Sequence, residues 1–166
     1  GRNAHQALRQ AQNYINEGFQ NIIDLDLKSF FDEVNHDLLL GLLGRKVKDP
    51  VLLKLIHSFL RSGLLLGGVM NQRGEGTQQG GSFSPLLSNI LLNELDGELT
   101  PRGHRFIRYA DDCSIFLRSK RSAHRVLKSV KRLIEQDLHL LVNQEKTAIR
   151  RPVRFELLGY GFVSSF

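Results

Sequence analysis

The segment 105–117, RFIRYADDCSIFL, constrains the fold of this chain more than any other stretch of it. Asp111 and Asp112 interrupt a run of aromatic and β-branched residues typical of strands, and aspartate is an ordinary turn residue. The pattern predicts two strands joined by a turn at Asp111 and Asp112. Because both flanks are strongly apolar, we expect a buried β-ribbon with the two carboxylates at its tip. The alternative interpretation is a plain surface hairpin.

A second pair of carboxylates lies upstream in residues 21–27, NIIDLDL, where Asp alternates with Leu and Ile. Alternation is the period of a strand with one polar face, and it puts Asp24 and Asp26 on the same face. We expect this strand to pair with the hairpin and so to gather the carboxylates. Two carboxylates about 4 Å apart repel each other by roughly 4 kcal/mol at an effective dielectric of about 20.

Carboxylates gathered in this way favour a divalent cation. Mg²⁺ prefers a few carboxylates together with substrate phosphates to a closed protein cage. Two such ions, about 3.5–4 Å apart, can activate an attacking 3′-hydroxyl and stabilise a pyrophosphate leaving group. Zn²⁺ is disfavoured because no cluster of His or Cys accompanies the aspartates. The residues therefore predict a site for two Mg²⁺ ions, with Mn²⁺ as an alternative.

The remaining segments predict helices that alternate with a few strands, a mixed α+β order. The first expected helix covers residues 4–16 and ends before Gly18. Further helices are indicated by capping signals at Asn35, at Asp49-Pro50 and at Ser84-Pro85, and by the apolar spacing of residues 122–138. We also expect a short strand at 64–70, a Gly- and Gln-rich loop at 71–81 and a short β element at 154–163.

The composition is that of an ordinary globular domain or a part of one, with 41% hydrophobic and 24% charged residues. No apolar run reaches the roughly 18 residues of a membrane helix. The single cysteine, Cys113, cannot form an internal disulfide, and we expect a reducing, cytoplasmic setting. The net charge of +6 fits either a nucleic-acid partner or a solvated basic surface. The basic residues concentrate in segments 118–132 and 150–154.

Five motifs of the chain, taken in order, resemble those of reverse transcriptases of the bacterial group II intron and maturase type. They are segments 26–36 (DLKSFFDEVNH), 79–89 (QGGSFSPLLSN), 109–112 (YADD), 141–147 (LVNQEKT) and 157–160 (LLGY). The first seven residues, GRNAHQA, also resemble the segment upstream of the first motif. The sequence departs from the family at Gln78, where proline is usual. That change loosens the start of the loop but removes no chemical group.

This resemblance implies an α+β fold, the palm of a right-hand polymerase, with a ferredoxin-like antiparallel sheet and packed helices. Part of the fingers would be present and the thumb absent. Residues 1–20 and 48–81 would be fingers-like, and residues 21–47 and 82–166 would form the palm. By itself, such a fragment is expected to be weakly active or inactive as a polymerase.

The resemblance also implies the metal ligands. Asp26 and Asp111 would hold both metals, Asp112 would be the supporting third carboxylate, and the carbonyl of Leu27 would be a further ligand. Asp24 is the alternative to Asp26 as the metal ligand on this strand. Asp26 is preferred because the metal aspartate of the family lies five residues before a bulky aromatic residue, which here is Phe31.

Contacts with nucleotide and primer follow from the same resemblance. Phe31 would lie beneath the incoming sugar and exclude a 2′-hydroxyl, which implies deoxynucleotide substrates. Gln79 and Gly80 would contact the nucleotide from the glycine loop. Lys146 would offset charge on the triphosphate or act as the general acid for pyrophosphate. The turn that holds the primer end would consist of Leu158, Gly159 and Tyr160.

The implied activity is RNA-directed DNA synthesis, with an RNA template, a DNA primer, a dNTP and an intron RNA as partners. A maturase role, in which the protein binds structured intron RNA without catalysis, is the main alternative. A palm-like nucleotide cyclase is disfavoured because its Gly-Gly turn signature is missing. An RNA-dependent RNA polymerase is disfavoured by Phe31 and Ala110. No membrane partner is expected, and the motifs specify no oligomeric state.

Overall fold

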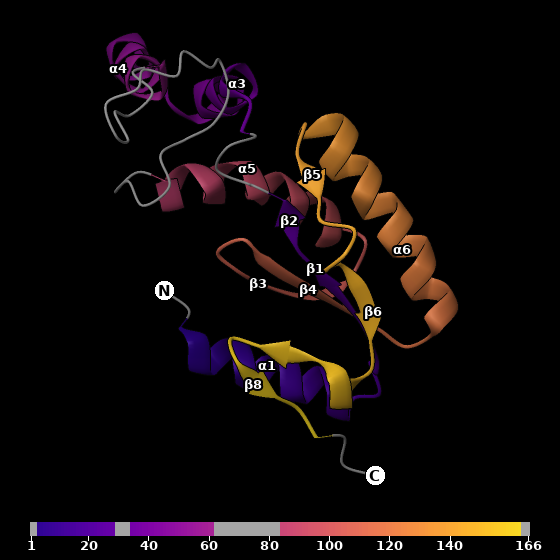
Figure 1. Cartoon of the computed structure of the whole chain (residues 1–166). Helices are drawn as coiled ribbons and strands as arrows, with labels where there is room; N and C mark the ends of the chain where they lie inside the picture. The colour runs from indigo at the N-terminus through magenta and orange to yellow at the C-terminus, as the bar shows by residue number, and fades with distance from the viewer. Residues whose placement is uncertain (1–2, 29–33, 62–83, 164–166) are drawn as a thin grey trace.

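The computed structural model describes residues 3–28, 34–61 and 84–163 (Figure 1). The strand expected at 64–70 and the loop expected at 71–81 lie outside these ranges, as do the predicted nucleotide contacts Phe31, Gln79 and Gly80. Within the described ranges, no helix has both the length and the apolar character needed to cross a lipid bilayer.

The centre of the fold is a four-stranded sheet in which all neighbouring strands are antiparallel. Its strand order is β3 (Arg105–Tyr109), β4 (Asp112–Leu117), β1 (Asn21–Leu25) and β6 (Ala148–Arg150). Helix α5 (Ser84–Leu99) precedes the β3–β4 hairpin, and α6 (Lys120–Arg132) connects β4 to β6. This β-α-β-β-α-β order with β1 and β4 central is the ferredoxin-like arrangement. It confirms the predicted α+β fold with an antiparallel sheet and packed helices.

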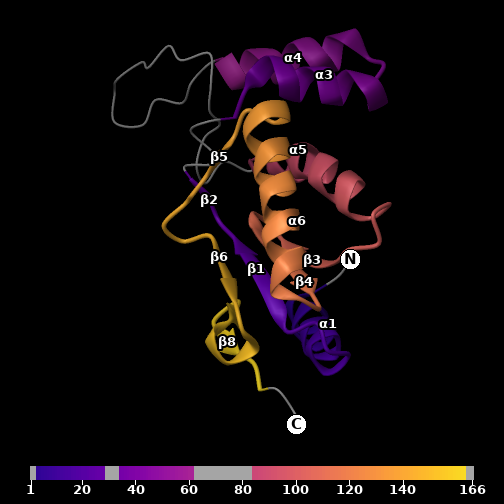
Figure 2. The same ribbon diagram turned by 90° about the vertical axis from the view of Figure 1, so that its right-hand side faces the viewer.

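Helices α5 and α6 cover one face of this sheet, and α1 (Ala4–Asn16) lies on the other (Figures 1 and 2). Alternation along each strand decides which side chains meet which helices. In β1, Ile23 packs on the side of α5 and α6, whereas Ile22 packs against α1. In β4, Ile115 likewise packs on the side of α5 and α6, and Phe116 packs on the side of α1. The sheet is thus buried on both faces at this end.

Smaller elements complete the fold. Helix α3 (His36–Lys46) packs with both α4 (Pro50–Arg61) and α5, and Leu133–Asp137 continues α6 as one π-helical turn. Two short ribbons pair β2 (Leu27–Lys28) with β5 (Leu141–Val142) and β7 (Glu156–Leu157) with β8 (Tyr160–Gly161). A 3-10 turn, Pro152–Arg154, precedes β7.

The helix boundaries confirm the capping signals of the sequence. The Asn35 side chain accepts a hydrogen bond from the Leu38 N–H at 2.9 Å. Asp49 Oδ1 accepts from the Val51 N–H at 2.8 Å, and α5 begins at Ser84, within the Ser84-Pro85 signal. Helix α1 has the predicted bounds and is followed by Gly18 with a φ of +90°. These ends are determined by residues within one turn of each helix.

Two boundaries differ from the expectation, and two short strands were not expected. Helix α6 begins at Lys120, two residues earlier than predicted, because Ser119 caps it by accepting from the Ser122 N–H at 3.1 Å. The strand expected over residues 21–27 is interrupted at Asp26, so that β1 and β2 belong to different sheets. Strands β5 and β6, which frame segment 143–147, were not predicted. They are two and three residues long and carry no alternating pattern of their own.

Cys113 offers a direct check of the sheet packing. It lies on β4 in the core shared with α5 and α6 and is 2% exposed. Burial, followed by the charge of Asp96, raises the pKa of its thiol to about 12. We therefore expect no reaction of the folded protein with a thiol reagent such as DTNB near neutral pH, and full reaction of Cys113 once the chain is unfolded. Rapid labelling of the folded protein would contradict this packing.

Candidate active site

The carboxylate-bearing hairpin has its turn one residue earlier than predicted. Tyr109 pairs with Asp112, so the two turn residues are Ala110 and Asp111. Ala110 has a φ of 55°, a backbone conformation that residues with a Cβ rarely adopt. The tight turn therefore needs support from neighbouring groups. As a result, Asp111 lies at the exposed tip and Asp112 is the first residue of β4.

Arg108 supplies that support. Its Nη1 donates to the Ala110 carbonyl at 3.1 Å and to Asn89 Oδ1 at 2.6 Å. Its Nε and Nη2 donate to the Asp96 carboxylate, with Nη2 2.8 Å from Oδ2. Asn89 and Asp96 both lie on α5, so this helix is tied to the hairpin tip. No role was assigned to Arg108 from the sequence. The available signal was strand alternation, which puts Arg108 on the same face as Phe106, a residue that packs toward the core.

Asp26 lies at the same end of the sheet as this hairpin. The register between β1 and β4 pairs Asp24 with Ser114 and Leu25 with Cys113. The next residue on each strand is therefore Asp26 on one side and Asp112 on the other. This confirms the prediction that the upstream strand pairs with the hairpin. Side-chain alternation puts Asp24 and Asp112 on the face opposite α5 and α6.

The carboxylates are close enough to influence one another. The pKa of Asp112 is raised, first by partial burial and then by the negative charges of Asp111, Asp24 and Asp26. Repulsion of this kind disfavours the ionised form of Asp112. A cation nearby would relieve it. This end of the sheet therefore concentrates negative charge from two strands and a turn.

Asp24 and Asp26 differ in what their side chains bind. Asp24 Oδ2 accepts from Arg150 Nε at 2.8 Å, an ion pair between β1 and β6. Within residues 3–28, 34–61 and 84–163, no side chain donates a hydrogen bond to the Asp26 carboxylate. Asp24 thus has a cationic partner, whereas the Asp26 carboxylate has none among the residues that the structure describes. The ion pair also removes Arg150 from the basic cluster expected at 150–154.

The backbone of Asp26 is held by the segment between β5 and β6. Thr147 Oγ1 accepts from the Asp26 N–H at 3.1 Å and donates to the Asp26 carbonyl at 3.2 Å. The Asn143 N–H donates to the same carbonyl at 2.9 Å. These bonds replace strand pairing and explain why β1 ends at Leu25. Neither residue was assigned a role from the sequence, although both belong to the recognised segment 141–147.

Lys146 and Leu27, two further predicted site residues, flank this clamp. Lys146 lies in the turn between Asn143 and Thr147, and its side chain is exposed. Leu27 follows Asp26 directly and pairs with Val142. The positively charged Lys146 is therefore the neighbour in sequence of Thr147, which holds the Asp26 backbone.

The predicted primer-contact turn is present as a tight hairpin. Leu158 and Gly159 have φ values of 54° and 78°, and they join Leu157 to its partner Tyr160. Two consecutive positive φ values are typical of a type I′ turn. The hairpin is packed with α1 on the face of the sheet that carries Asp24 and Asp112 (Figure 1). The Tyr160 side chain is 59% exposed.

The donor chemistry at this end of the sheet suits a hard divalent cation. Its candidate ligands are carboxylate oxygens, which Mg²⁺ and Mn²⁺ prefer, without the thiolates or imidazoles typical of Zn²⁺. Among the described residues, no three His, Cys, Asp or Glu side chains are drawn together closely enough to hold an ion by themselves. The carboxylates therefore suit such an ion in their chemistry, but the described side chains do not assemble a complete site by themselves.

Comparisons with known proteins agree with this arrangement. The reverse transcriptase (RNA-dependent DNA polymerase) family matches residues 1–162. The group II intron-encoded protein LtrA of Lactococcus lactis subsp. cremoris is 39% identical over 95 residues, which are 57% of this chain and 16% of LtrA. Protein YkfC of Escherichia coli (strain K12) is 28% identical over 162 residues, covering 77% of this chain and 42% of YkfC.

The fold has a counterpart among solved structures. The telomerase of Candida tropicalis, in complex with the TWJ fragment of telomeric RNA, superposes with a TM-score of 0.70 at 16% identity, over 95% of this chain and 31% of that one. At such low identity, the likeness supports the fold alone. The chain spans less than half the length of each of these relatives. Because the family match covers nearly all of its residues, the chain belongs to the reverse transcriptase family.

Proposed function

We propose that this chain carries the polymerase site of an RNA-directed DNA polymerase. In the reaction, the 3′-hydroxyl of a DNA primer attacks the α-phosphate of a dNTP, opposite an RNA template. The observation that carries the proposal is the placement of Asp26 beside the Asp111–Asp112 hairpin at one end of paired strands, in a member of this family.

Asp26 and Asp111 would hold two divalent ions, Mg²⁺ or Mn²⁺, with Asp112 as the third carboxylate and the Leu27 carbonyl as a further ligand. When bound, such ions supply activation of the primer hydroxyl and stabilisation of the pyrophosphate leaving group. The protein's own contribution is to hold the ligands in place. Arg108 supports the hairpin tip, and Thr147 and Asn143 hold the backbone of Asp26. Ligands held in this way need little rearrangement during the reaction.

The remaining predicted residues would serve substrate binding. Phe31 would exclude the 2′-hydroxyl, and Gln79 and Gly80 would contact the nucleotide. The exposure of Lys146, one residue from the clamp on Asp26, supports a role in offsetting triphosphate charge. In the primer-contact turn, the exposed ring of Tyr160 supports contact with an external partner.

If the chain has this polymerase function, residues 1–20 and 48–81 would belong to the fingers and residues 21–47 and 82–166 to the palm. We also propose that the protein works in the cytoplasm, where its single thiol, Cys113, would stay reduced.

A maturase role is the second candidate. The observation in its favour is the similarity to LtrA, a group II intron-encoded protein, together with the strongly basic helix α6. In this role, the chain would bind structured intron RNA, and it would do so without the carboxylates. The two roles are compatible in one protein and differ in their dependence on Asp26.

The substrate assignment is tested with the longest natural polypeptide that carries this chain. On a primed RNA template, we expect incorporation of dNMP that stops with a chelator and returns with Mg²⁺ or Mn²⁺. An aromatic wall against the sugar should disfavour ribonucleotides by about a hundredfold, the usual limit for an apolar contact that rejects one hydroxyl. Extension by ribonucleotides at an equal rate would contradict the assigned role of Phe31. Extension that proceeds in the chelator would contradict the metal site.

A further inference from the structure

The outward face of helix α6 is far more basic than its stability requires. Its 13 residues, KRSAHRVLKSVKR, contain no Asp or Glu. The six cations are Lys120, Arg121, Arg125, Lys128, Lys131 and Arg132. Lys120 and Arg121 occupy the first turn, where the helix dipole disfavours positive charge. The like-charged pairs Arg121–Arg125 and Lys128–Arg132, four residues apart, also repel each other. The cations of the first turn and these like-charged pairs oppose helix formation, whereas Lys131 and Arg132 in the last turn favour it. The unfavourable charges at the start and middle of the helix point to a role in binding.

No carboxylate forms an ion pair with these cations within the part of the chain that the structure describes, although the Glu135 side chain lies near Lys131 on the same surface. The ion pairs found there involve Arg45, Arg102, Arg108 and Arg150, and none of the cations of α6. Arg132 Nε donates to a neutral group, Gln136 Oε1, at 3.1 Å. The positive charge of α6 is therefore left for an external anionic partner.

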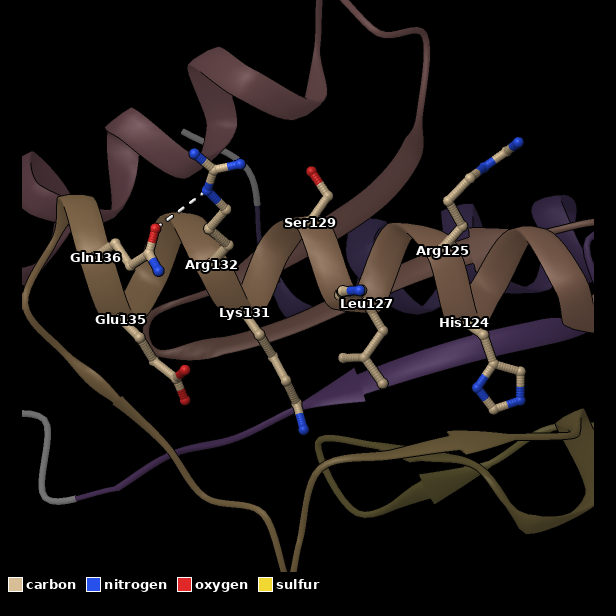
Figure 3. Close-up of a pocket in the computed structure, with 9 residues that line it drawn as sticks. His124, Arg125, Leu127, Ser129, Lys131, Arg132, Glu135 and Gln136 are labelled. Carbon is tan, nitrogen blue, oxygen red and sulfur yellow. Dashed lines mark hydrogen bonds between the residues drawn. The ribbon is translucent and has the colours of Figure 1, made fainter.

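The packing of α6 turns these side chains outward along one line. Ala123, Val126 and Val130 are buried against the sheet, so the basic residues occupy the opposite side. Arg121, Arg125, Lys128 and Arg132 recur at helical spacing over 12 residues, a row about 16 Å long. Figure 3 shows Arg125 and Arg132 leaving the helix on one side and His124 and Lys131 on the other. An open hollow of about 660 Å³ runs between these side chains.

This row lies on the side of the sheet away from the candidate active site. Helix α6 packs over Ile23 and Ile115, whereas Asp24 pairs with Ser114 on the other face. Figure 2 shows α6 standing in front of the sheet, with α1 at its lower end. A template–primer duplex seated on the carboxylates would therefore be separated from α6 by the sheet itself. A partner of α6 is a different nucleic-acid segment.

The side chains of α6 also indicate which form of nucleic acid fits. Proteins that bind single strands stack bases on aromatic rings, and α6 contains no Phe, Tyr or Trp. A row of cations without such rings suits the phosphates of a double helix. We propose that α6 docks a double-helical segment of RNA at a second site, separate from the polymerase site. The choice of RNA over DNA rests on the proposed function, which makes RNA the substrate of this protein.

The test uses the longest natural polypeptide that carries the chain, with Arg121→Gln, Arg125→Gln, Lys128→Gln and Arg132→Gln combined. The probes are an RNA hairpin with a long stem, a DNA duplex of the same sequence and a single-stranded RNA. For the RNA hairpin we expect about a tenfold or greater loss of affinity near 0.1 M salt. The slope of log affinity against log salt should become shallower by about 3.6, since each of the four lost phosphate contacts contributes about 0.9. The melting temperature should stay the same or rise, because repulsion within α6 is removed.

A matched variant keeps every charge: Arg121→Lys, Arg125→Lys, Lys128→Arg and Arg132→Lys. It should bind the RNA hairpin as the unaltered protein does. Unchanged affinity and salt slope in the glutamine variant, or equal losses in both variants, would overturn the proposal. Equal loss of DNA-duplex or single-strand binding would also overturn it, because the site would then not be selective for double-helical RNA.

Primer extension separates this proposal from the proposed function. On a short annealed template–primer, the glutamine variant should extend as fast as the unaltered protein. Slower extension would show that α6 belongs to the polymerase site and would overturn the second site. An unaltered protein that binds RNA through α6 but extends no primer would instead refute the polymerase assignment and leave the docking surface standing.

Discussion

Replacing Asp26 with Asn is expected to slow primer extension about a thousandfold, the loss of about 4 kcal/mol of transition-state stabilisation. The neutral amide would be a far poorer metal ligand than the carboxylate. The backbone clamp by Thr147 and Asn143 does not involve the side chain, so the fold around position 26 should persist. The measurement is single-nucleotide extension of a primed RNA template at saturating Mg²⁺ in the longest natural polypeptide that carries the chain.

Asp24→Asn is the matched control, the same chemical change two residues away. The Asp24 carboxylate is paired with Arg150, and both side chains are about a third exposed, at 33% and 37%. Breaking such a pair should cost less than about 1 kcal/mol of stability and leave extension within a few fold. A larger loss from Asp24→Asn than from Asp26→Asn would show that the ligand assignment is reversed.

The same Asp26→Asn protein separates the two candidate functions. Its affinity for structured RNA should remain within about twofold, because one neutralised carboxylate adds no repulsion to phosphate. Retained RNA binding with lost synthesis is the pattern expected if catalysis and RNA docking use different surfaces. If RNA binding falls with synthesis, that division of roles is wrong.

Arg108→Met is expected to destabilise the protein by about 3 kcal/mol, because it leaves the Asp96 carboxylate without its partner. The two side chains are only 13% and 25% exposed, so water can compensate little of the loss. The change also removes the bond to the Ala110 carbonyl that supports the hairpin tip. We therefore expect lower polymerase activity at temperatures where the protein remains folded. Urea unfolding and primer extension measure the two effects separately.

Arg102→Met is the control for this prediction. Arg102 also pairs with a carboxylate of α5, Glu98, but the two side chains are 48% and 47% exposed. Its loss should cost no more than about 0.5 kcal/mol. The double variant Arg108→Met with Asp96→Leu should recover most of the stability, since no charge is left without a partner. Its activity should stay low because the Ala110 carbonyl remains unsupported. Full recovery of activity would show that Arg108 acts only through stability.

Much of the fold could be predicted because its signals are local. Asn35 and Asp49 bond to N–H groups two or three residues away, and such caps can be read from neighbouring letters. Hydrophobic alternation likewise predicted the hairpin and the strand that pairs with it. The predicted turn of the hairpin, at Asp111 and Asp112, was wrong by one residue because aspartate is a common turn residue and alanine is not. The actual turn includes Ala110, and Arg108 supports it through its contacts with α5.

For the three aspartates of the candidate site, some properties follow from the sequence and others only from tertiary contacts. The sequence alone determined that Asp26, Asp111 and Asp112 stand beside apolar strands, because alternation and turn chemistry act over a few residues. Tertiary structure decided how Asp24 and Asp26 differ. Arg150 forms an ion pair with Asp24 from 126 residues away, and Thr147 holds the backbone of Asp26 by hydrogen bonds from 121 residues away. No local pattern can reveal such contacts, because they exist only once β6 has paired with β1.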